Sequence, residues 1–280
     1  MKRHLPVLLA GLLPVAVTAA SLNDTGSTIC TDGGTVYTTC TTLLDNGSSL
    51  PHQDARYGVS AMDNAGVYYS KQGGSATKGR DYSKVCNSGE PAGTGACPAA
   101  PVLGVAANEW GCTKDNVTGL TWEMKVNNSA SLHHKNWYFS WYDSNPATNG
   151  GVKGKINGGT CLNQYNATTN PTGKSCDTQG FVTAVNAAGL CGATDWRMPS
   201  IRELDTLVDY NLYGAANAEG AGAIDNTWFP YTKGHGFWSS SANAGNSNQA
   251  WYLAFQDGYA MPTGNPNDPG SVRLVRGTTP

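Results

Sequence analysis

The stretch CGATDWRMPSIREL, residues 191–204, decides how the second half of the chain is organised. Ser200 followed three residues later by Glu203 is the capping-box pattern of a helix start, and Pro199 separates that helix from any earlier one. A helical pattern does precede the stretch, and it ends at Gly189, a typical helix stop. The stretch is therefore predicted to form the turn between two helices.

The triplet Asp195-Trp196-Arg197 lies in this turn and has two interpretations. As an active site, Asp195 would act as a base and Arg197 as an anion clamp. As a structural joint, Arg197 would pair with a buried carboxylate and Trp196 would fill the core under the helices. Because a helix stop, Cys191 and the capping box surround the triplet, we favour a structural role for Asp195, Trp196, Arg197 and Glu203.

Two helices are predicted from apolar residues that recur every three to four positions. The segment TQGFVTAVNAAGL, 178–190, has a buried face made of Phe181, Val182, Val185 and Ala188. The segment SIRELDTLVDY, 200–210, has a buried stripe made of Ile201, Leu204, Leu207 and Val208.

A pair of short strands is predicted before the helices. The segment EWGCTKDNVTGLTWEMK, 109–125, contains Asp115-Asn116 and Thr118-Gly119 between apolar anchors. Such turn-forming residues between β-prone runs suit two strands around a tight loop.

Further strands are predicted after the helices. The runs 237–241, 250–258 and 271–277 alternate apolar and polar residues, as half-buried antiparallel strands do. In the second run, Trp251, Leu253 and Phe255 share the buried face. Residues 256–270 are expected to be a connection. The order of strands, two helices and strands indicates an α+β fold.

The chain opens with a basic start, an apolar run over 5–17 and then small residues. This pattern is typical of a secretory signal with cleavage near Ala19 or Ala20, and the run is too short to span a membrane. No later run approaches membrane length, so the mature protein is expected to be secreted, at the cell surface or in the periplasm. We expect a signal at 1–20, an irregular β-rich segment at 21–107 and a domain at 108–277.

All eight cysteines follow the expected signal, and an even number in an exported chain indicates four disulfides. Local bridges are expected within the turn-rich segments, and the two remaining cysteines would tie the first strand of the domain to the inter-helix turn. The predicted pairs are Cys30–Cys40, Cys86–Cys97, Cys161–Cys176 and Cys112–Cys191. A thiolate zinc site is disfavoured because no C-x2-C pair is present.

The charge of the chain is mildly acidic. The formal net charge is −2, and loss of the two positive charges of Lys2 and Arg3 with the signal makes it −4. Charged residues are only 14% of the chain, which argues against nucleic acid as a partner.

The aromatic segment NWYFSWY, 136–142, is the strongest candidate for ligand contact. If it is extended, alternate residues Trp137, Phe139 and Trp141 face the core. Tyr138 and Tyr142 are then left nearer the surface, where their rings could stack against a sugar. These two tyrosines are our predicted ligand-binding residues.

Metal and nucleophile motifs are weak. His133 and His134 are adjacent and cannot share a helix or strand face, and no zinc-protease spacing occurs. No G-x-S-x-G is present. Oxygen atoms of four loop residues could bind calcium, but turn formation by NPNDPG explains most of them, so no metal or cofactor is predicted. The four residues are Asp257, Asn265, Asn267 and Asp268.

Several phrases in order resemble one family: DNVTGLTWEMK (115–125), FVTAVNAAGLCGATDWRMPSIRELDTLVDY (181–210), IDNTWFP (224–230), FWSSSA (237–242), AWYLAFQDG (250–258) and VRLVRG (272–277). They resemble the Lcl C-terminal domain, an adhesin head of secreted bacterial proteins. The resemblance implies a C-type-lectin-like α+β head, surface exposure, often assembly into trimers and so a homo-oligomer, and, for the member after which the family is named, adhesion to sulfated glycosaminoglycans.

Sulfate binding requires clusters of Lys and Arg, and the densest basic pieces here are Lys153 with Lys155 and Arg273 with Arg276. We therefore expect a non-catalytic binding head for a neutral glycan or a protein ligand. The alternatives are a structural subunit of a surface filament and, third, an enzyme related to the formylglycine-generating oxidases. The oxidase would need a free cysteine pair, whereas every cysteine here has an expected partner.

Overall fold

The computed structural model describes residues 80–161, 176–212, 218–263 and 269–278, and the backbone of two short paired strands nearer the N-terminus. These strands are β1 (Cys30–Thr31) and β2 (Val36–Tyr37). The expected signal and the side chains of the predicted Cys30–Cys40 pair lie outside the described residues. In the described part of the chain, no helix is long and apolar enough to cross a membrane.

The first sheet has four antiparallel strands in the order β3-β4-β5-β9. They are β3 (Tyr82–Cys86), β4 (Trp110–Asp115), β5 (Thr121–Glu123) and β9 (Val275–Arg276). The predicted hairpin at 109–125 is confirmed. Its turn is closed by Asp115, whose Oδ1 accepts from the backbone N–H groups of Val117 and Thr118 at 2.9 and 3.2 Å. Strand β3 was not predicted, and it adds an outer strand from the segment before residue 108.

The second sheet is an antiparallel meander of β6 (Gly236–Ala242), β7 (Ala250–Ala254) and β8 (Tyr259–Thr263). The expectation that 256–270 is only a connection is wrong, because β8 lies within it. Asp257-Gly258 forms the turn from β7 into β8: Asp257 Oδ1 accepts from the Tyr259 N–H at 3.0 Å, and Gly258 has φ +74°. An Asp-Gly pair is a strong hairpin signal that the sequence prediction overlooked.

The predicted one-sided burial of this sheet is also wrong. Phe237 and Leu253 pack into one core cluster, while Trp238 packs into the other, on the opposite face of β6. Trp251, expected on the buried face, is only half-buried, whereas Ala254 is buried. Both faces of the sheet are therefore covered. Alternation of apolar and polar residues predicts one buried face and one face in solvent, so it could not indicate this environment.

The longer helix, α3 (Thr178–Ala188), agrees with the prediction. Asp177 caps its N-terminus by accepting from the Gly180 N–H at 2.7 Å, and Gly189 ends it in the left-handed conformation with φ +69°. The buried face contains Phe181 and Val185 as expected, but Ala184 is buried in place of Ala188, which is exposed.

The second helix, α4 (Ile201–Asp205), is much shorter than predicted. Its capping box is present, with Ser200 accepting from the Glu203 N–H and Glu203 accepting from the Ser200 N–H. After Thr206 the chain leaves the helix and places Leu207 and Val208 in the core. The Asp209 N–H then donates to the Ala223 carbonyl at 2.9 Å. The chain after α4 is therefore bonded to a distant segment in place of a further helical turn, and a 3₁₀ turn, Tyr210–Leu212, follows.

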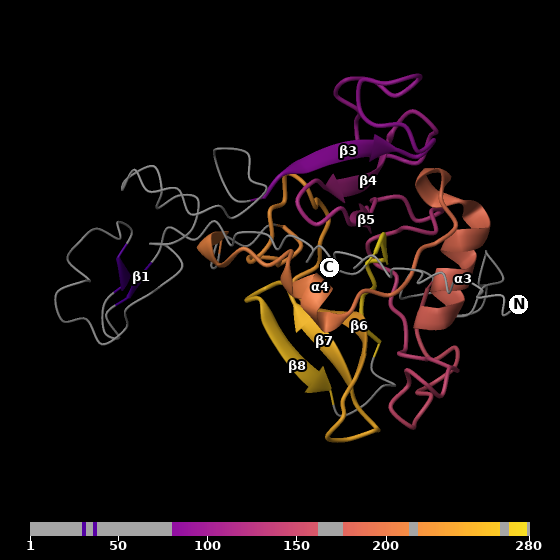
Figure 1. The fold of residues 1–280 in the computed structure, drawn as a ribbon, viewed down its shortest axis with the longest axis vertical. Helices are drawn as coiled ribbons and strands as arrows, with labels where there is room; N and C mark the ends of the chain where they lie inside the picture. Colours follow the sequence, from indigo (N-terminus) through magenta and orange to yellow (C-terminus); the bar gives the residue numbers. More distant parts are fainter. Residues whose placement is uncertain are drawn as a thin grey trace, which may run out of the picture.

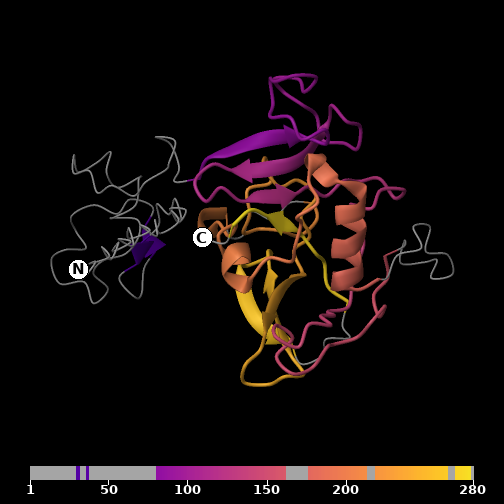
Figure 2. The same ribbon diagram turned by 45° about the vertical axis from the view of Figure 1, so that its right-hand side comes forward.

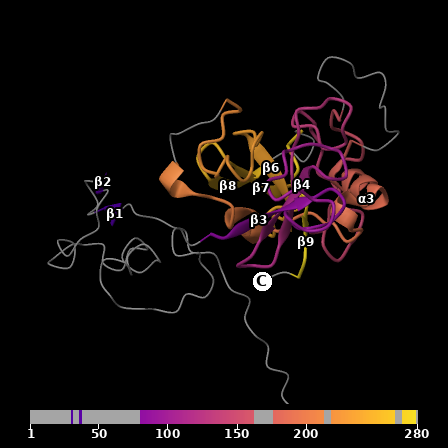
Figure 3. The ribbon, with the colours of Figure 1, turned by 90° about the horizontal axis from the view of Figure 1, so that it is seen from above.

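The two sheets lie one beyond the other, with α4 between them and α3 packed along one side of both (Figures 1 and 2). Viewed from above, α3 is seen nearly end-on beside β4 (Figure 3). The C-terminal segment connects the sheets, because Ser271 bonds to Gly236 of β6 and Val275 pairs with Trp122 of β5. Between residues 80 and 278, the described residues therefore form an α+β fold with two α-helices and two antiparallel sheets around two apolar core clusters.

Three predicted disulfides are confirmed: Cys86–Cys97, Cys161–Cys176 and Cys112–Cys191. The last joins β4 to the 3₁₀ turn Leu190–Gly192 that follows α3, and both its cysteines are buried. It closes a separation of 79 residues, so it restricts the unfolded chain more than the other two.

Candidate functional site

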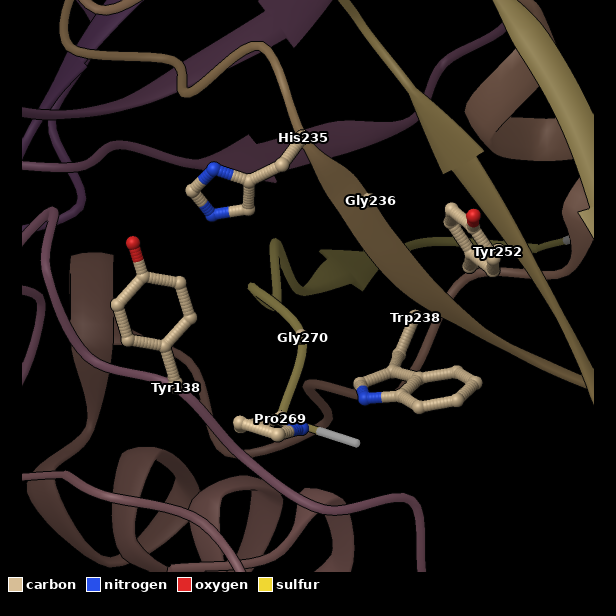
Figure 4. Close-up of a pocket in the computed structure, with 7 residues that line it drawn as sticks. All are labelled: Tyr138, His235, Gly236, Trp238, Tyr252, Pro269 and Gly270. Carbon is tan, nitrogen blue, oxygen red and sulfur yellow. The ribbon is translucent and has the colours of Figure 1, made fainter. Parts of the chain in front are cut away.

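An aromatic pocket of about 300 Å³ lies where three distant segments meet. It is lined by Tyr138, His235, Gly236, Trp238, Tyr252, Pro269 and Gly270 (Figure 4). Tyr138 comes from the aromatic segment, the next four residues from β6, β7 and the residue before β6, and the last two from the C-terminal segment. Residues from one local stretch alone could not form it.

Backbone hydrogen bonds hold these segments together. The Phe139 N–H donates to the Gly270 carbonyl at 2.8 Å, and the Gly270 N–H returns a bond to the Phe139 carbonyl at 3.0 Å. On the other side, the Trp238 N–H donates to the Ser271 carbonyl at 2.9 Å, and the Ser271 N–H donates to Gly236 at 3.0 Å. The C-terminal segment is thus clamped between the aromatic segment and β6, which fixes the pocket walls.

The rings form two pairs on opposite sides of Gly270 (Figure 4). Tyr138 and His235 lie with ring centroids 5.0 Å apart and planes 31° apart. Trp238 and Tyr252 lie 6.1 Å apart in an edge arrangement. Trp238 is only 2% exposed, and its Nε1–H donates to the Phe139 carbonyl at 2.9 Å. Trp238 therefore forms a rigid floor, while the half-buried Tyr138 offers more of its ring to a ligand.

Two glycines allow the rings to lie against the backbone. A Cβ atom on Gly270 would approach Trp238 Nε1 to 2.7 Å, and one on Gly236 would overlap the Tyr252 ring. Any larger residue at either position would push a ring out of place.

The described residues that line the pocket include no carboxylate, lysine or arginine. Burial lowers the pKa of His235 below its ordinary value of 6.5, and the nearby Lys233 ammonium lowers it further. His235 Nε2 lies 3.1 Å from the Ser271 hydroxyl, and the Tyr252 hydroxyl donates to Met261 Sδ at 2.9 Å. Lys233 itself is paired with Glu219, outside the pocket lining.

The structure separates the two predicted ligand residues. Tyr138 lines the pocket, but Tyr142 does not: it bridges Gly154, and its carbonyl accepts from the Thr178 hydroxyl at 2.8 Å. The inward-facing set is confirmed, since Trp137, Phe139 and Trp141 are all buried in one core cluster. Sequence reasoning missed the remaining lining residues, for which the only signal was the aromatic content of β6 and β7.

The residues predicted to form a structural joint do make structural contacts. Arg197 donates two hydrogen bonds to the Glu203 carboxylate at 2.8 and 2.7 Å, and Trp196, 2% exposed, donates to the Leu190 carbonyl at 2.9 Å. Asp195 pairs with Arg276 at 2.7 Å on the surface. Asp195 and Arg197 are both engaged with other side chains, so they are poorly placed to act as a catalytic base and an anion clamp.

A buried ion cluster beneath β5 was not predicted. The fully buried Glu123 carboxylate accepts from Lys125 at 2.6 Å, from His133 Nδ1 at 2.8 Å and from the Leu274 N–H at 2.9 Å. Burial alone would raise the pKa of Glu123, but Lys125 and His133 outweigh burial and lower it to about 2. Glu123 therefore remains ionised in the core and joins β5 to the C-terminal segment.

Arg273 belongs to the same region and is not the surface residue that the alternating pattern predicted. It is fully buried, and it donates to the Glu123 carbonyl at 2.6 Å and to the Thr232 hydroxyl at 2.8 Å. Its guanidinium lies 5.2 Å from the Phe229 ring centroid, and burial lowers its pKa to about 10. Arg276 therefore lies at the surface without Arg273 beside it, and the two do not form a basic pair there.

The structure brings together no metal site in the part it describes. No group of three His, Cys, Asp or Glu residues there could hold a metal ion. Of the calcium candidates, Asp257 caps the β7–β8 turn, while Asn265, Asn267 and Asp268 lie outside the described residues.

Comparison with known proteins gives one match. The family model described as the Lcl C-terminal domain matches residues 111–276, which include every residue that lines the pocket. No curated protein and no solved structure matches the chain.

Proposed function

The chain belongs to the Lcl C-terminal domain family, and on that premise we propose that it is a non-catalytic binding head that holds a glycan or protein ligand in its aromatic pocket. The three disulfides of the described residues are consistent with an oxidising extracellular or periplasmic location. The proposal includes a C-type-lectin-like fold, with which two helices and two antiparallel sheets are compatible.

The aromatic pocket is the observation that carries the proposal. Ligand sites are typically concave, lined by aromatic and apolar groups, and supplied with a few polar groups that fix orientation. This pocket has four rings, and three of them besides Trp238 carry a polar atom: Tyr138, His235, which bonds to Ser271, and Tyr252, whose hydroxyl bonds to Met261. Its walls are set by backbone bonds that join the C-terminal segment to Phe139 on one side and to β6 on the other, so the pocket is preformed.

The surroundings of Ser271 and of the cysteines favour binding over chemistry. The Ser271 hydroxyl is within hydrogen-bond reach of His235, as in a nucleophile and base pair. However, Ser271 is only 2% exposed and does not line the pocket, so a substrate could not approach its hydroxyl. The oxidase alternative requires a free thiol, and no described cysteine is free.

The distribution of positive charge supports a ligand other than a sulfated polymer. Arg273 is buried, and Arg276 is paired with Asp195. Of the basic pieces noted in the sequence, only Lys153 and Lys155 remain exposed. Neutralising a polyanion requires several cations on one face, and two lysines offer little of this attraction.

An array of glycans and matrix proteins tests the proposal. We expect saturable binding of the purified protein that is weakened by Tyr138→Ala and unchanged by Tyr142→Ala, the matched control outside the pocket. Because Tyr138 is held in place by backbone bonds to Thr160, the substitution should leave the fold intact, which circular dichroism can verify. If the protein polymerises as its concentration rises and binds neither the glycans nor the matrix proteins of the array, the result would instead support a structural subunit.

A further inference from the structure

We propose that copies of this chain associate head to tail, with an apolar loop at one end of the domain resting against an exposed isoleucine at the other end of the next copy. The loop, residues 90–109, is called the tip, and residues 153–156 are called the knob. The partner of each surface is thus a second copy of this chain. The contact lies outside the pocket, because neither surface contains a residue that lines it.

The exposed aliphatic side chains gather on these two surfaces. Among the described residues, three large aliphatic side chains are exposed: Val102 and Val105 of the tip are 69% and 52% exposed, and Ile156 of the knob is 62% exposed. Around the two valines the tip adds exposed alanines and prolines, at positions 91, 96, 98–100, 106 and 107. Exposed apolar residues that lie together mark interaction surfaces, whereas single scattered ones need no explanation.

The tip is held in one conformation. The disulfide Cys86–Cys97 closes its base. Asn87 donates from Nδ2 to three carbonyls of the tip at 3.0 or 3.1 Å, those of Gly104, Ala106 and Glu109. A loop that is already ordered loses little conformational entropy when it binds, so the tip is preorganised for contact.

The tip is negatively charged. Its sequence contains two glutamates, Glu90 and Glu109, and no lysine or arginine. Glu109 Oε2 accepts from the Ala106 N–H at 2.8 Å, so this carboxylate lies beside Val105. Lys84 of β3 donates to a carbonyl of the tip at 3.3 Å, and with its charge included the tip keeps a net charge of −2 + 1 = −1.

The knob is positively charged and is also well anchored. Lys153 and Lys155 are exposed, Ile156 follows them, and residues 151–159 contain no carboxylate. The Lys155 N–H donates to a carbonyl of the aromatic segment at 3.0 Å, and the Asn157 N–H donates to Asp177 Oδ2 at 2.8 Å. An apolar side chain flanked by cations complements an apolar loop flanked by carboxylates, and such complementarity fixes which surfaces meet.

The two surfaces lie at opposite ends of α3. Asn157 bonds to Asp177, the N-cap of α3, so the knob is at the N-terminal end of the helix. The turn before the tip packs at the other end, because a Cβ atom on Gly89 would lie 2.8 Å from the carbonyl oxygen of Cys191, in the 3₁₀ turn after α3. In Figures 1 and 2 the tip is the purple loop at the top, and the pink segment that contains the knob lies in the lower part.

This separation determines the kind of assembly. A helix of 11 residues is about 16 Å long, so the tip of one copy cannot cover its own knob. Two different surfaces that face in different directions form a heterologous contact, which leaves a tip and a knob open at the two ends of every pair. Association therefore continues from copy to copy.

Sedimentation equilibrium of the purified protein tests the proposal. We expect the weight-average mass to rise with concentration between about 1 μM and about 1 mM, the range of modest affinities. Raising the salt from about 0.01 M to about 1 M shortens the Debye length from ~30 Å to ~3 Å and should reduce the association. A mass that stays at one copy throughout overturns the proposal, and association that is insensitive to salt overturns the charge complementarity on which it rests.

Two variants and their mixture test the head-to-tail arrangement. Val102→Lys with Val105→Lys places cations opposite the knob lysines, and Ile156→Glu places a carboxylate opposite the tip glutamates. Each variant alone should remain monomeric, whereas an equal mixture should form pairs and nothing larger, because the intact knob of the first binds the intact tip of the second. Thr183→Lys, at an exposed position on α3, is the control and should associate like the wild type. Circular dichroism verifies that all variants fold.

The remaining outcomes overturn the proposal. If Ile156→Glu associates by itself, the contact joins tip to tip; if both variants associate like the wild type, another surface is responsible. A mixture that stays monomeric shows that tip and knob do not face each other. These results are independent of the proposed function, because ligand binding on the array depends on Tyr138 and is measured separately in each variant.

Discussion

Replacing Glu123 with glutamine should destabilise the protein at neutral pH and remove part of its sensitivity to acid. The substitution keeps the size of the side chain and deletes the one carboxylate that faces Lys125 in the core. Removing one partner of a buried ion pair costs ~3–5 kcal/mol, because the other charge is left uncompensated.

The pKa of Glu123 leads to a similar magnitude. A fall from the ordinary value of 4.5 to about 2 corresponds to ~3 kcal/mol of stability. Because the folded-state pKa is lowered, this contribution is fully present above pH 4.5 and is lost as the pH falls toward 2. For a domain of this size, ~3 kcal/mol corresponds to a decrease in Tm of ~6–12 °C.

Urea unfolding followed by tryptophan fluorescence, repeated from pH 7 to pH 2.5, measures the effect. Glu123→Gln should be about 3 kcal/mol less stable than the wild type at pH 7, and the gap should close on acidification. Asp205→Asn, at the C-terminal end of α4, is the control: partial desolvation of its carboxyl raises the pKa of Asp205, so its pH dependence has the opposite sign. A Glu123→Gln variant with wild-type stability at pH 7, or a gap that persists at pH 2.5, would refute the reasoning.

Three further predictions concern the joint and the pocket. Replacing Cys112 and Cys191 together with serine should lower the free energy of unfolding by about 4 kcal/mol, measured by urea titration, and a loss under 1 kcal/mol would contradict the role of this bridge. Ser200→Ala should cost about 1 kcal/mol in the same assay, because the α4 N-cap bond to the backbone is lost; an unchanged midpoint would show that the cap contributes nothing. Gly270→Ala should lower the free energy of unfolding by ~1–3 kcal/mol, because the added Cβ displaces Trp238, and it should also weaken ligand binding. Thermal unfolding measures the first effect and the ligand array the second; unaltered binding would show that Trp238 can move without harm to the pocket.

Local features of the fold could be predicted because they depend on residues close together in the chain. The caps at Ser200 and Gly189 use hydrogen bonds within a few residues, and the turn at Asp115 is closed by its own side chain. The short α4 could not be predicted, because the residues after it place Leu207 and Val208 in the core and bond Asp209 to Ala223, contacts that lie outside the local sequence.

The candidate site could be predicted only in part. Alternation in the aromatic segment correctly distinguished buried Phe139 from the more exposed Tyr138. The same argument could not distinguish Tyr138 from Tyr142, because the choice depends on which one faces His235 and Gly270. Periodicity assigns a side chain to a face of a strand but does not say what lies opposite that face.

By itself, the sequence determined the α+β class, the helix caps at Gly189 and Ser200, three of the disulfide pairs and the family. The tertiary structure alone decided that Arg273 is buried, that Glu123 stays ionised in the core and that a pocket exists. The physical reason is the range of the interactions. Caps and turns are satisfied within one turn of chain, whereas a buried charge or a pocket is defined by groups that only folding brings together.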